Sequence, residues 1–198
     1  MPRDFLTHKR PCENIMFVFI DRDGVINKNY DGSYINRWDD FEFLPGIFTA
    51  LRKLAAENIR CAVISNQSGV GKKIMTEEEL YAVDGKMHEE LRRNGCAVEK
   101  TYYCIHRPDE GCSCRKPMPG LLEKACREMN LNPAEGFFVG DYFTDVEAGK
   151  SAGIRTILVK TGRGKDALLM RDEWNVKPDF IAGDLNEAID IILKNKEK

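Results

Sequence analysis

The 198-residue sequence lacks long hydrophobic runs and a strong net charge. No apolar stretch approaches the roughly 20 residues that a membrane-spanning helix needs, and the segment before residue 15 lacks the apolar core of a signal peptide. Because the net charge is only −2 at pH 7, nothing indicates a nucleic-acid or membrane-surface partner. We therefore expect a soluble, cytoplasmic protein with neither kind of partner.

The sequence also contains no internal repeat and no low-complexity segment. Its length suits a single domain over residues 1–198, and its hydrophobic content of 42% is enough for a sizeable core. Short apolar runs predict strands at 15–20, 61–64, 101–104, 137–139, 156–159 and 179–181, and helices are expected at 45–58, 76–94, 119–129, 145–152 and 185–193. This alternation predicts an α/β fold, with a doubly wound, Rossmann-like and mostly parallel sheet.

The first apolar run is followed at once by two carboxylates. In the stretch IMFVFIDRDGVIN, Asp21 and Asp23 come directly after a strand that reads as buried on both faces. A carboxylate is costly to place there, and open α/β sheets bind ligands just outside the carboxyl ends of their strands. Two carboxylates this close repel each other unless a cation or a shared proton relieves them. Taken alone, the motif also fits an acidic turn that closes a core strand.

Other predicted strand ends carry polar groups of matching chemistry. In a parallel sheet these ends share one edge, so the groups can converge. Carboxylate oxygens are ligands of Mg²⁺, while a hydroxyl and an ammonium suit phosphate oxygens. The expected set comprises Asp21, Asp23, Ser65, Asn66, Arg115, Lys116, Asp141 and Asp145.

The two aspartates of the first strand can divide the work of phosphoryl transfer. Asp21 would attack phosphorus as the nucleophile. Asp23 would protonate the leaving oxygen and later activate water.

Three of the seven cysteines lie close together in the sequence, at 104, 112 and 114. In a reducing compartment such a cluster favours a metal site over disulfides. The alternative is unpaired cysteines beside a surface His106. The cysteines at 12, 61, 96 and 126 have no partner at metal-ligand spacing, and we expect them to be small buried residues.

The segment 28–44 is too long for an ordinary connection between a strand and a helix. Its aromatic residues indicate an ordered loop, and they are Tyr30, Tyr34, Trp38, Phe41 and Phe43. The loop either helps to bind a ligand over the site or packs on the edge of the sheet.

As a set, these motifs resemble those of the haloacid dehalogenase (HAD) superfamily of phosphatases. The matching residues, in the family's order, are Asp21-Arg-Asp23-Gly24, Ser65, Lys116 and Gly140-Asp141 with Asp145. No inserted segment is long enough for a cap domain. The resemblance therefore implies a capless HAD-like phosphatase that acts on a small phosphorylated substrate, and we expect a monomer. It also implies that Asp21, Asp23 and Asp141 hold Mg²⁺, with Asp145 behind them.

A narrower resemblance is to the branch of heptose bisphosphate phosphatases and histidinol phosphatases. It is carried by Asn66-Gln-Ser-Gly69, the cysteine segment and Arg115-Lys-Pro-x-Pro-Gly120. In that branch three cysteines and a histidine bind a structural Zn²⁺, which implies a zinc loop at 104–117, inserted after the third strand. Three thiolates and one imidazole give a closed tetrahedral site. The implied ligands are Cys104, His106, Cys112 and Cys114.

The resemblance also implies which residues contact the substrate. Asp31, Gly32, Ser33 and Tyr34 would contact a sugar; Ser65, Asn66, Gln67 and Ser68 would contact the phosphate; and Arg115 would contact a distal group. The stretch 66–71 favours removal of the 7-phosphate of heptose 1,7-bisphosphate, a step of lipopolysaccharide biosynthesis. Histidinol phosphate, from histidine biosynthesis, stays open as the substrate. Lys72-Lys73 departs from the Arg-Gly pair that is common in heptose enzymes.

Two hypotheses of other classes compete with an enzyme. A non-enzymatic signalling domain, phosphorylated on an aspartate, also places acidic residues at strand ends. It needs neither Asp23 nor a zinc loop, so Asp23 is the discriminating residue. A zinc-binding interaction module would leave Asp21, Asp141 and Lys116 without a role.

Overall fold

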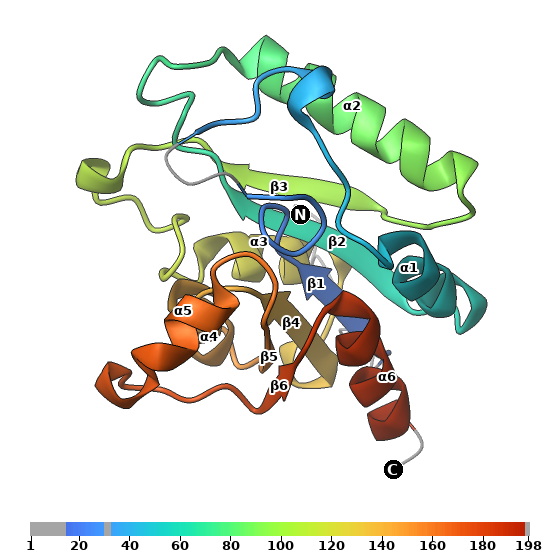
Figure 1. Ribbon diagram of the computed structural model, residues 1–198. Coiled ribbons are helices and arrows are strands. Elements are labelled where there is room, and N and C mark those ends of the chain that lie inside the picture. Colours follow the sequence, from blue (N-terminus) through green and yellow to red (C-terminus); the bar gives the residue numbers. More distant parts are fainter. Residues whose placement is uncertain (1–14, 30–32, 197–198) are drawn as a thin grey trace, which may run out of the picture.

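The computed structural model describes residues 15–29 and 33–196. They form a six-stranded parallel sheet with the order β3-β2-β1-β4-β5-β6 (Figure 1). The strands are β1 (Phe17–Ile20), β2 (Arg60–Asn66), β3 (Lys100–Cys104), β4 (Gly136–Gly140), β5 (Arg155–Val159) and β6 (Phe180–Ala182). The helices are α1 (Ile47–Ala56), α2 (Glu77–Arg93), α3 (Gly120–Met129), α4 (Phe143–Ser151), α5 (Gly164–Leu169) and α6 (Leu185–Lys196).

The strand order creates a switch point between β1 and β4. From β1 the chain builds outward through β2 to β3, and it then returns to the other side of β1 and continues through β4 and β5 to β6. In such a sheet the crevice for a ligand opens where the order reverses, beyond the carboxyl ends of the strands. The site is therefore expected at the ends of β1 and β4, where Asp21 and Asp141 lie.

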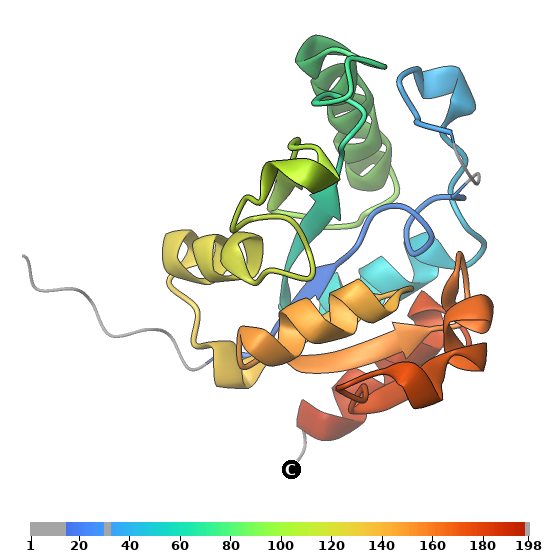
Figure 2. The same ribbon diagram turned by 90° about the vertical axis from the view of Figure 1, so that its left-hand side faces the viewer.

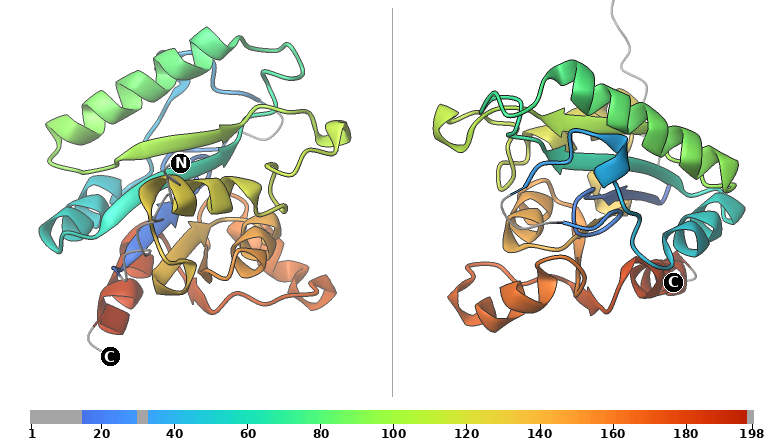
Figure 3. Two further views of the ribbon diagram at one scale, coloured as in Figure 1. Left: turned by 180° about the vertical axis from the view of Figure 1, so that it is seen from behind. Right: turned by 45° about the horizontal axis from the view of Figure 1, so that its top comes forward.

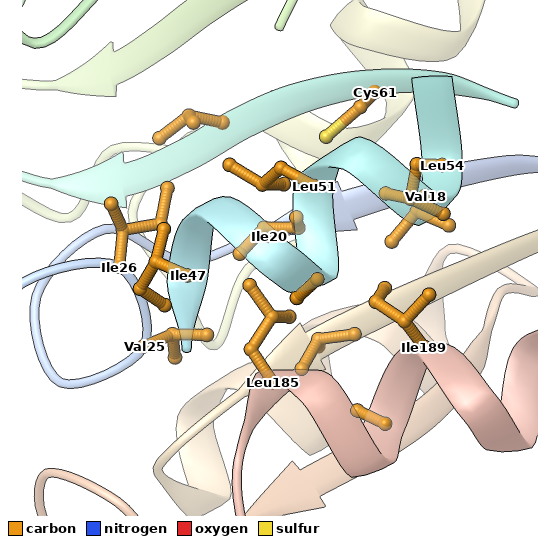
Figure 4. Close-up of a cluster of buried hydrophobic side chains, with 14 of the residues drawn as sticks. Val18, Ile20, Val25, Ile26, Ile47, Leu51, Leu54, Cys61, Leu185 and Ile189 are labelled. Atoms are coloured by element: carbon orange, nitrogen blue, oxygen red, sulfur yellow. The ribbon is translucent and has the colours of Figure 1, made fainter. Parts of the chain in front are cut away.

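Alternation along the buried strands separates two cores, one on each face of the sheet. Val18 and Ile20 of β1 face a core that α1, α2 and α6 cover, whereas Phe17 and Phe19 face a core that α3 covers. Figures 2 and 3 show helices on both faces of the sheet. In Figure 4, Leu51 of α1 and Leu185 and Ile189 of α6 gather beside Ile20 and Val18 of β1. Both faces being covered explains why the strands read as continuous apolar runs.

A local signal sets the start of α2, the longest helix of the described residues. Thr76 accepts a hydrogen bond from the backbone N–H of Glu79, and the Glu79 carboxylate accepts one from the backbone N–H of Thr76. This is the capping box that the sequence predicts for the start of α2, and it satisfies two amide groups that the first helical turn leaves free.

The loop before α1 was expected either to bind a ligand over the site or to pack on the edge of the sheet, and its two halves differ in this respect. Trp38 stacks on Phe41, and Phe43 contacts Phe48 of α1, so this half packs against the core. The other half, with Tyr34, lines the cavity described below. Tyr30, Asp31 and Gly32 lie outside the described residues.

The predicted doubly wound sheet is confirmed, and it is parallel throughout its described strands. Helix α5 is not among the helices expected from the sequence. Between β1 and α1, and between β3 and α3, the described residues form loops with short 3-10 turns, η1 (Trp38–Asp40) and η2 (Pro108–Glu110), and no cap domain. Across residues 15–29 and 33–196 no helix combines the length and the apolar character needed to cross a membrane.

Candidate active site

Three carboxylates meet at the carboxyl edge of the sheet. Asp21 follows β1, Asp141 follows β4, and Asp145 lies in the first turn of α4. All three side chains are buried, and each offers an oxygen within 4.8 Å of the others. Asp21 extends the strand pairing, since its backbone N–H donates to the carbonyl of Val139 at 2.9 Å. The sheet itself therefore sets where the first carboxylate lies.

A single buried ammonium faces this group from the loop before α3. Lys116 Nζ lies 2.9 Å from Asp21 Oδ2 and 2.6 Å from Asp145 Oδ1. It also donates to the backbone carbonyl of Ile64 at 3.1 Å. One ammonium cannot balance three carboxylates, so the described side chains leave excess negative charge at this point.

The excess charge shifts the protonation of the site. Burial raises the pKa of Asp21 to about 7; Lys116 opposes this rise, and Asp145 and Asp23 add to it. Burial likewise raises the pKa of Asp141 well above its ordinary value, and Asp145 and Asp21 add to the effect. Burial acts to lower the pKa of Lys116, but Asp145 and Asp21 hold it above its ordinary value. A further cation would relieve this strain between the carboxylates.

Glycines allow close approach around Asp141. Gly24 has a positive φ of 88°, and a Cβ there would lie 2.0 Å from Asp141 Oδ2. Gly162, after β5, has a φ of 52°, and a Cβ there would lie 2.1 Å from the same oxygen. The next residue, Arg163, donates its backbone N–H to Asp141 Oδ2 at 2.8 Å. The loop after β5 therefore closes over the carboxylate cluster.

The end of β2 supplies the polar side chains expected there. Ser65 is buried, and its Oγ accepts from Gln67 Nε2 at 3.1 Å. Asn66 is tied to the backbone of Lys116 by two hydrogen bonds, each 3.1 Å long. Ser65 and Asn66 therefore come together with Lys116 as the sequence predicts.

Asp23 lies beside the three-carboxylate group rather than within it. Its carboxylate accepts from Gln67 Nε2 at 2.6 Å and from Asn27 Nδ2 at 2.9 Å. Arg22 also contacts it, through Nε and Nη2. The metal-ligand role predicted for Asp23 stays a prediction. Asp145, which was expected to lie behind the ligands, has its carboxylate within the three-carboxylate group.

A cavity of about 300 Å³ opens above these groups. Among the residues proposed from sequence, its walls contain Asp21, Asp23, Ser33, Tyr34, Ser65, Asn66, Gln67, Arg115, Lys116, Asp141 and Asp145. Ser68 is not among the lining residues, but its hydroxyl lies 3.3 Å from that of Tyr34, which is. Asp31 and Gly32, proposed to contact the sugar, lie outside the described residues.

Sequence reasoning missed part of the cavity wall. Tyr142, Thr144 and Arg163 also line it, and the Arg163 guanidinium lies 3.6 Å from the centre of the Tyr142 ring. The sequence does contain a signal for Arg163, because Gly162-Arg-Gly164 follows β5 at the same edge of the sheet as the other site residues.

The cysteine segment forms a second compact group beside the first. Cys114 Sγ lies 3.4 Å from Cys104 Sγ and from Cys112 Sγ, and 3.1 Å from His106 Nδ1. These separations are far longer than a disulfide bond of about 2.05 Å. They approach the roughly 3.5–3.8 Å expected between ligands of a tetrahedral zinc ion. The four side chains therefore fit a closed metal site.

The cysteine segment, residues 104–114, is tied to the residues of the first site. The backbone N–H of Gln67 donates to the carbonyl of Cys104 at 2.7 Å, and Gly71 N–H donates to the carbonyl of Ile105 at 3.0 Å. A Cβ at Gly71 would lie 2.7 Å from that carbonyl oxygen, so the two loops pack closely here. Arg115 and Lys116 follow the last cysteine directly.

The fold and the cluster at its carboxyl edge define a HAD-like hydrolase. The HAD-hydrolase-like family model matches residues 113–188. A D-glycero-beta-D-manno-heptose-1,7-bisphosphate 7-phosphatase from Yersinia pestis is 35% identical over 159 residues, covering 76% of this chain and 84% of the relative. A D-glycero-alpha-D-manno-heptose-1,7-bisphosphate 7-phosphatase from Campylobacter jejuni is 36% identical over 160 residues, covering 81% and 91%.

A solved structure agrees with these relatives. The D,D-heptose 1,7-bisphosphate phosphatase of B. bronchiseptica, complexed with magnesium and phosphate, superposes with a TM-score of 0.83 at 30% identity. The match covers 91% of this chain and 99% of that one. The chain therefore belongs to the family of the heptose-1,7-bisphosphate 7-phosphatases.

Proposed function

We propose that the protein is a Mg²⁺-dependent phosphatase that removes the 7-phosphate of D-glycero-D-manno-heptose 1,7-bisphosphate through an aspartyl-phosphate intermediate. The observation that carries the proposal is Lys116 held between Asp21 and Asp145 at the floor of a polar cavity. A nucleophilic carboxylate beside a fixed cation is the arrangement that phosphoryl transfer to a side chain requires.

In this mechanism Asp21 attacks phosphorus and the bond to the sugar oxygen breaks. Lys116 and the Ser65 hydroxyl hold the phosphoryl oxygens and offset their charge. Asp23 gives its proton to the leaving sugar oxygen, and then takes a proton from the water that attacks the aspartyl-phosphate. The second step releases inorganic phosphate and restores the Asp21 carboxylate.

Mg²⁺ suits the excess negative charge at the cluster. Asp21 and Asp141 would hold the ion, with Asp145 next to them and Asp23 on the adjacent turn. Carboxylate oxygens together with substrate phosphate are its usual ligands in proteins. When bound, it supplies positive charge that offsets the charge of the transferring phosphoryl group.

A distal group of the substrate would meet Arg115. This side chain lines the cavity, and its Nη1 is buried without a hydrogen-bond partner among the described residues. A buried guanidinium N–H without a partner is costly, and a second phosphate would satisfy it. The polar residues Ser33, Tyr34, Asn66, Gln67 and Ser68 are proposed to complete the contacts to sugar and phosphate, with Asp31 and Gly32 from the neighbouring turn.

Zn²⁺ is proposed as the structural ion of the cysteine segment. Cys104, His106, Cys112 and Cys114 would hold it, which would brace the loop that carries Arg115 and Lys116. Reduced thiols are typical of the cytoplasm, where we propose that the enzyme works. Since one chain supplies all described site residues, we propose a single-domain monomer, to be checked by light scattering.

The proposal is tested by phosphate release with Mg²⁺ from heptose 1,7-bisphosphate and from histidinol phosphate at matched concentrations. A preference for the bisphosphate by orders of magnitude in kcat/KM supports it. A preference for histidinol phosphate would assign the chain to histidine biosynthesis instead. Arg115→Gln sharpens the test, because it should raise KM for the bisphosphate more than for heptose 7-phosphate, which lacks the distal phosphate.

A further inference from the structure

Arg22, between the two aspartates of the first strand, is the largest side chain in the described structure that is fully buried. An arginine never loses its charge in a protein, so its burial requires a partner. An arginine in a phosphatase cavity would ordinarily be read as a phosphate ligand. Its contacts point to a different task.

The guanidinium of Arg22 turns back onto its neighbour. Nη2 lies 3.1 Å from both carboxylate oxygens of Asp23, and Nε lies 3.2 Å from Oδ1. The Arg22 side chain is 1% exposed and that of Asp23 is 23% exposed. The pair therefore buries its cation and leaves part of the carboxylate open to the cavity.

The far end of the guanidinium is held by a tyrosine on another strand. Its Nη1 lies 3.5 Å from the hydroxyl of Tyr103 on β3, and its Cζ lies 5.6 Å from the centre of that ring. The Tyr103 hydroxyl in turn donates to Asp84 Oδ1 on α2 at 2.8 Å. A continuous chain of contacts thus runs from Asp23 through Arg22 and Tyr103 to a helix that carries none of the reacting groups.

The Asp23 carboxylate is consequently fixed from three directions. Arg22 approaches both oxygens, Asn27 donates to Oδ1, and Gln67 donates to Oδ2. Among these, only Arg22 carries a charge and grips both oxygens. A group that transfers a proton must point at the reacting atom to within a fraction of an ångström.

We propose that Arg22 is a positioning residue: its guanidinium sets the orientation of the Asp23 carboxylate toward the leaving oxygen, and Tyr103 and Asp84 hold the guanidinium in place. The proposal rests on the proposed phosphatase activity, with Asp23 as the proton donor. It separates two neighbouring charged residues by role, since Asp23 contacts the substrate and Arg22 acts through it.

The test compares Arg22→Lys with the wild type on two substrates. Heptose 1,7-bisphosphate loses an alkoxide, which needs a proton, whereas p-nitrophenyl phosphate loses an anion that is stable without one. Lysine keeps the charge but cannot grip two oxygens at once. We expect kcat/KM to fall about 10-fold or more for the bisphosphate and less than about 3-fold for the aryl phosphate.

Arg60→Lys is the matched control. Arg60 also grips a carboxylate with two nitrogens, each 2.8 Å from Glu99, but it lies at the other end of β2. This variant should leave the ratio of the two kcat/KM values unchanged. If Arg22→Lys does not fold, Tyr103→Phe decides, because removing the hydroxyl should shift the same ratio in the same direction by a smaller factor.

An equal fall of kcat/KM on both substrates would overturn the inference, since a merely structural role does not depend on the leaving group. If Arg22→Lys does not fold, an unchanged ratio of the two kcat/KM values in Tyr103→Phe would overturn it as well. A wild-type protein that releases phosphate from neither compound would instead overturn the proposed function.

Discussion

Lys116 Nζ lies 2.9 Å from Asp21 Oδ2, and it is the side-chain cation that faces the buried carboxylate cluster. The two residues are far apart in sequence and are joined by the topology. Asp21 ends the first strand, whereas Lys116 comes from the loop between β3 and α3. The proposed nucleophile and its cation thus both come from the half of the sheet formed by β1, β2 and β3, on one side of the switch point.

Replacing this cation should damage both activity and stability. Lys116→Met should lower kcat by about 100-fold or more, because a fixed charge at the transferring phosphoryl group is lost. It should also destabilise the Mg²⁺-free protein by about 3 kcal/mol or more, since two buried carboxylates, Asp21 and Asp145, lose their partner. Steady-state kinetics and denaturant unfolding check both effects. Lys124→Met, on an exposed pair with Glu128, should change neither.

Magnesium should stabilise the protein more at high pH than at low pH. The pKa of Asp21 is raised from 3.8 to about 7. Between these two pH values, the metal-free folded state therefore keeps a proton on Asp21 that the unfolded state has lost. The stability that the protonated Asp21 contributes is fully present below pH 3.8 and is lost as the pH rises through about 7. Mg²⁺ binds the deprotonated form, and so its shift of Tm should be larger near about pH 8 than near about pH 5. A pH-independent shift would contradict this account of the cluster.

Asp179 should stabilise the edge of the sheet in a pH-dependent way. Its carboxylate accepts from the backbone N–H of Thr156 at 2.7 Å and pairs with Lys150 at 2.5 Å. Burial acts to raise the pKa of Asp179, but Lys150 and Thr156 hold it below its ordinary value of 3.8. The stabilisation is therefore present above 3.8 and is lost as the pH falls through the lowered pKa.

Asp179→Asn should accordingly lower the unfolding free energy by about 1 kcal/mol at neutral pH. The difference from the wild type should shrink below about pH 4. Urea unfolding at several pH values measures it. Asp172→Asn serves as the comparison, because its side chain is 94% exposed and its ion contacts are 3.9 Å or longer.

Loss of one cysteine ligand should remove the second metal. Cys114→Ser should abolish zinc retention through dialysis and lower Tm by roughly 5 °C or more, since the cysteine segment would lose the ion that holds it together. Cys126→Ala, at a buried cysteine of α3 that is not one of the four proposed ligands, should keep the zinc. Zinc retained in full by Cys114→Ser would show that this cysteine is not a ligand.

Much of this site can be predicted from the sequence, for a physical reason. Carboxylates that directly follow an apolar run, such as Asp21 and Asp141, are conspicuous because a buried strand does not otherwise tolerate them. The cysteine group is equally visible, since ligands within ten residues of one another need only a local turn to meet.

What the sequence does not reveal depends on contacts between distant segments. Helix α5 is six residues long and begins at a glycine, so it has no periodic apolar face to detect. The closure of Gly162 against Gly24 and Asp141 is a tertiary contact that brings Arg163 to the cavity wall. The direction of the Arg22 side chain is equally invisible, because the sequence does not show that its guanidinium contacts Asp23 and Tyr103.

The most direct test of the account is phosphate release from heptose 1,7-bisphosphate with Mg²⁺ by the wild type and by Asp21→Asn. An amide cannot form the aspartyl-phosphate, so the variant should show no turnover while unfolding as cooperatively as the wild type. Retention of activity by Asp21→Asn would contradict the central claim that this carboxylate is the nucleophile.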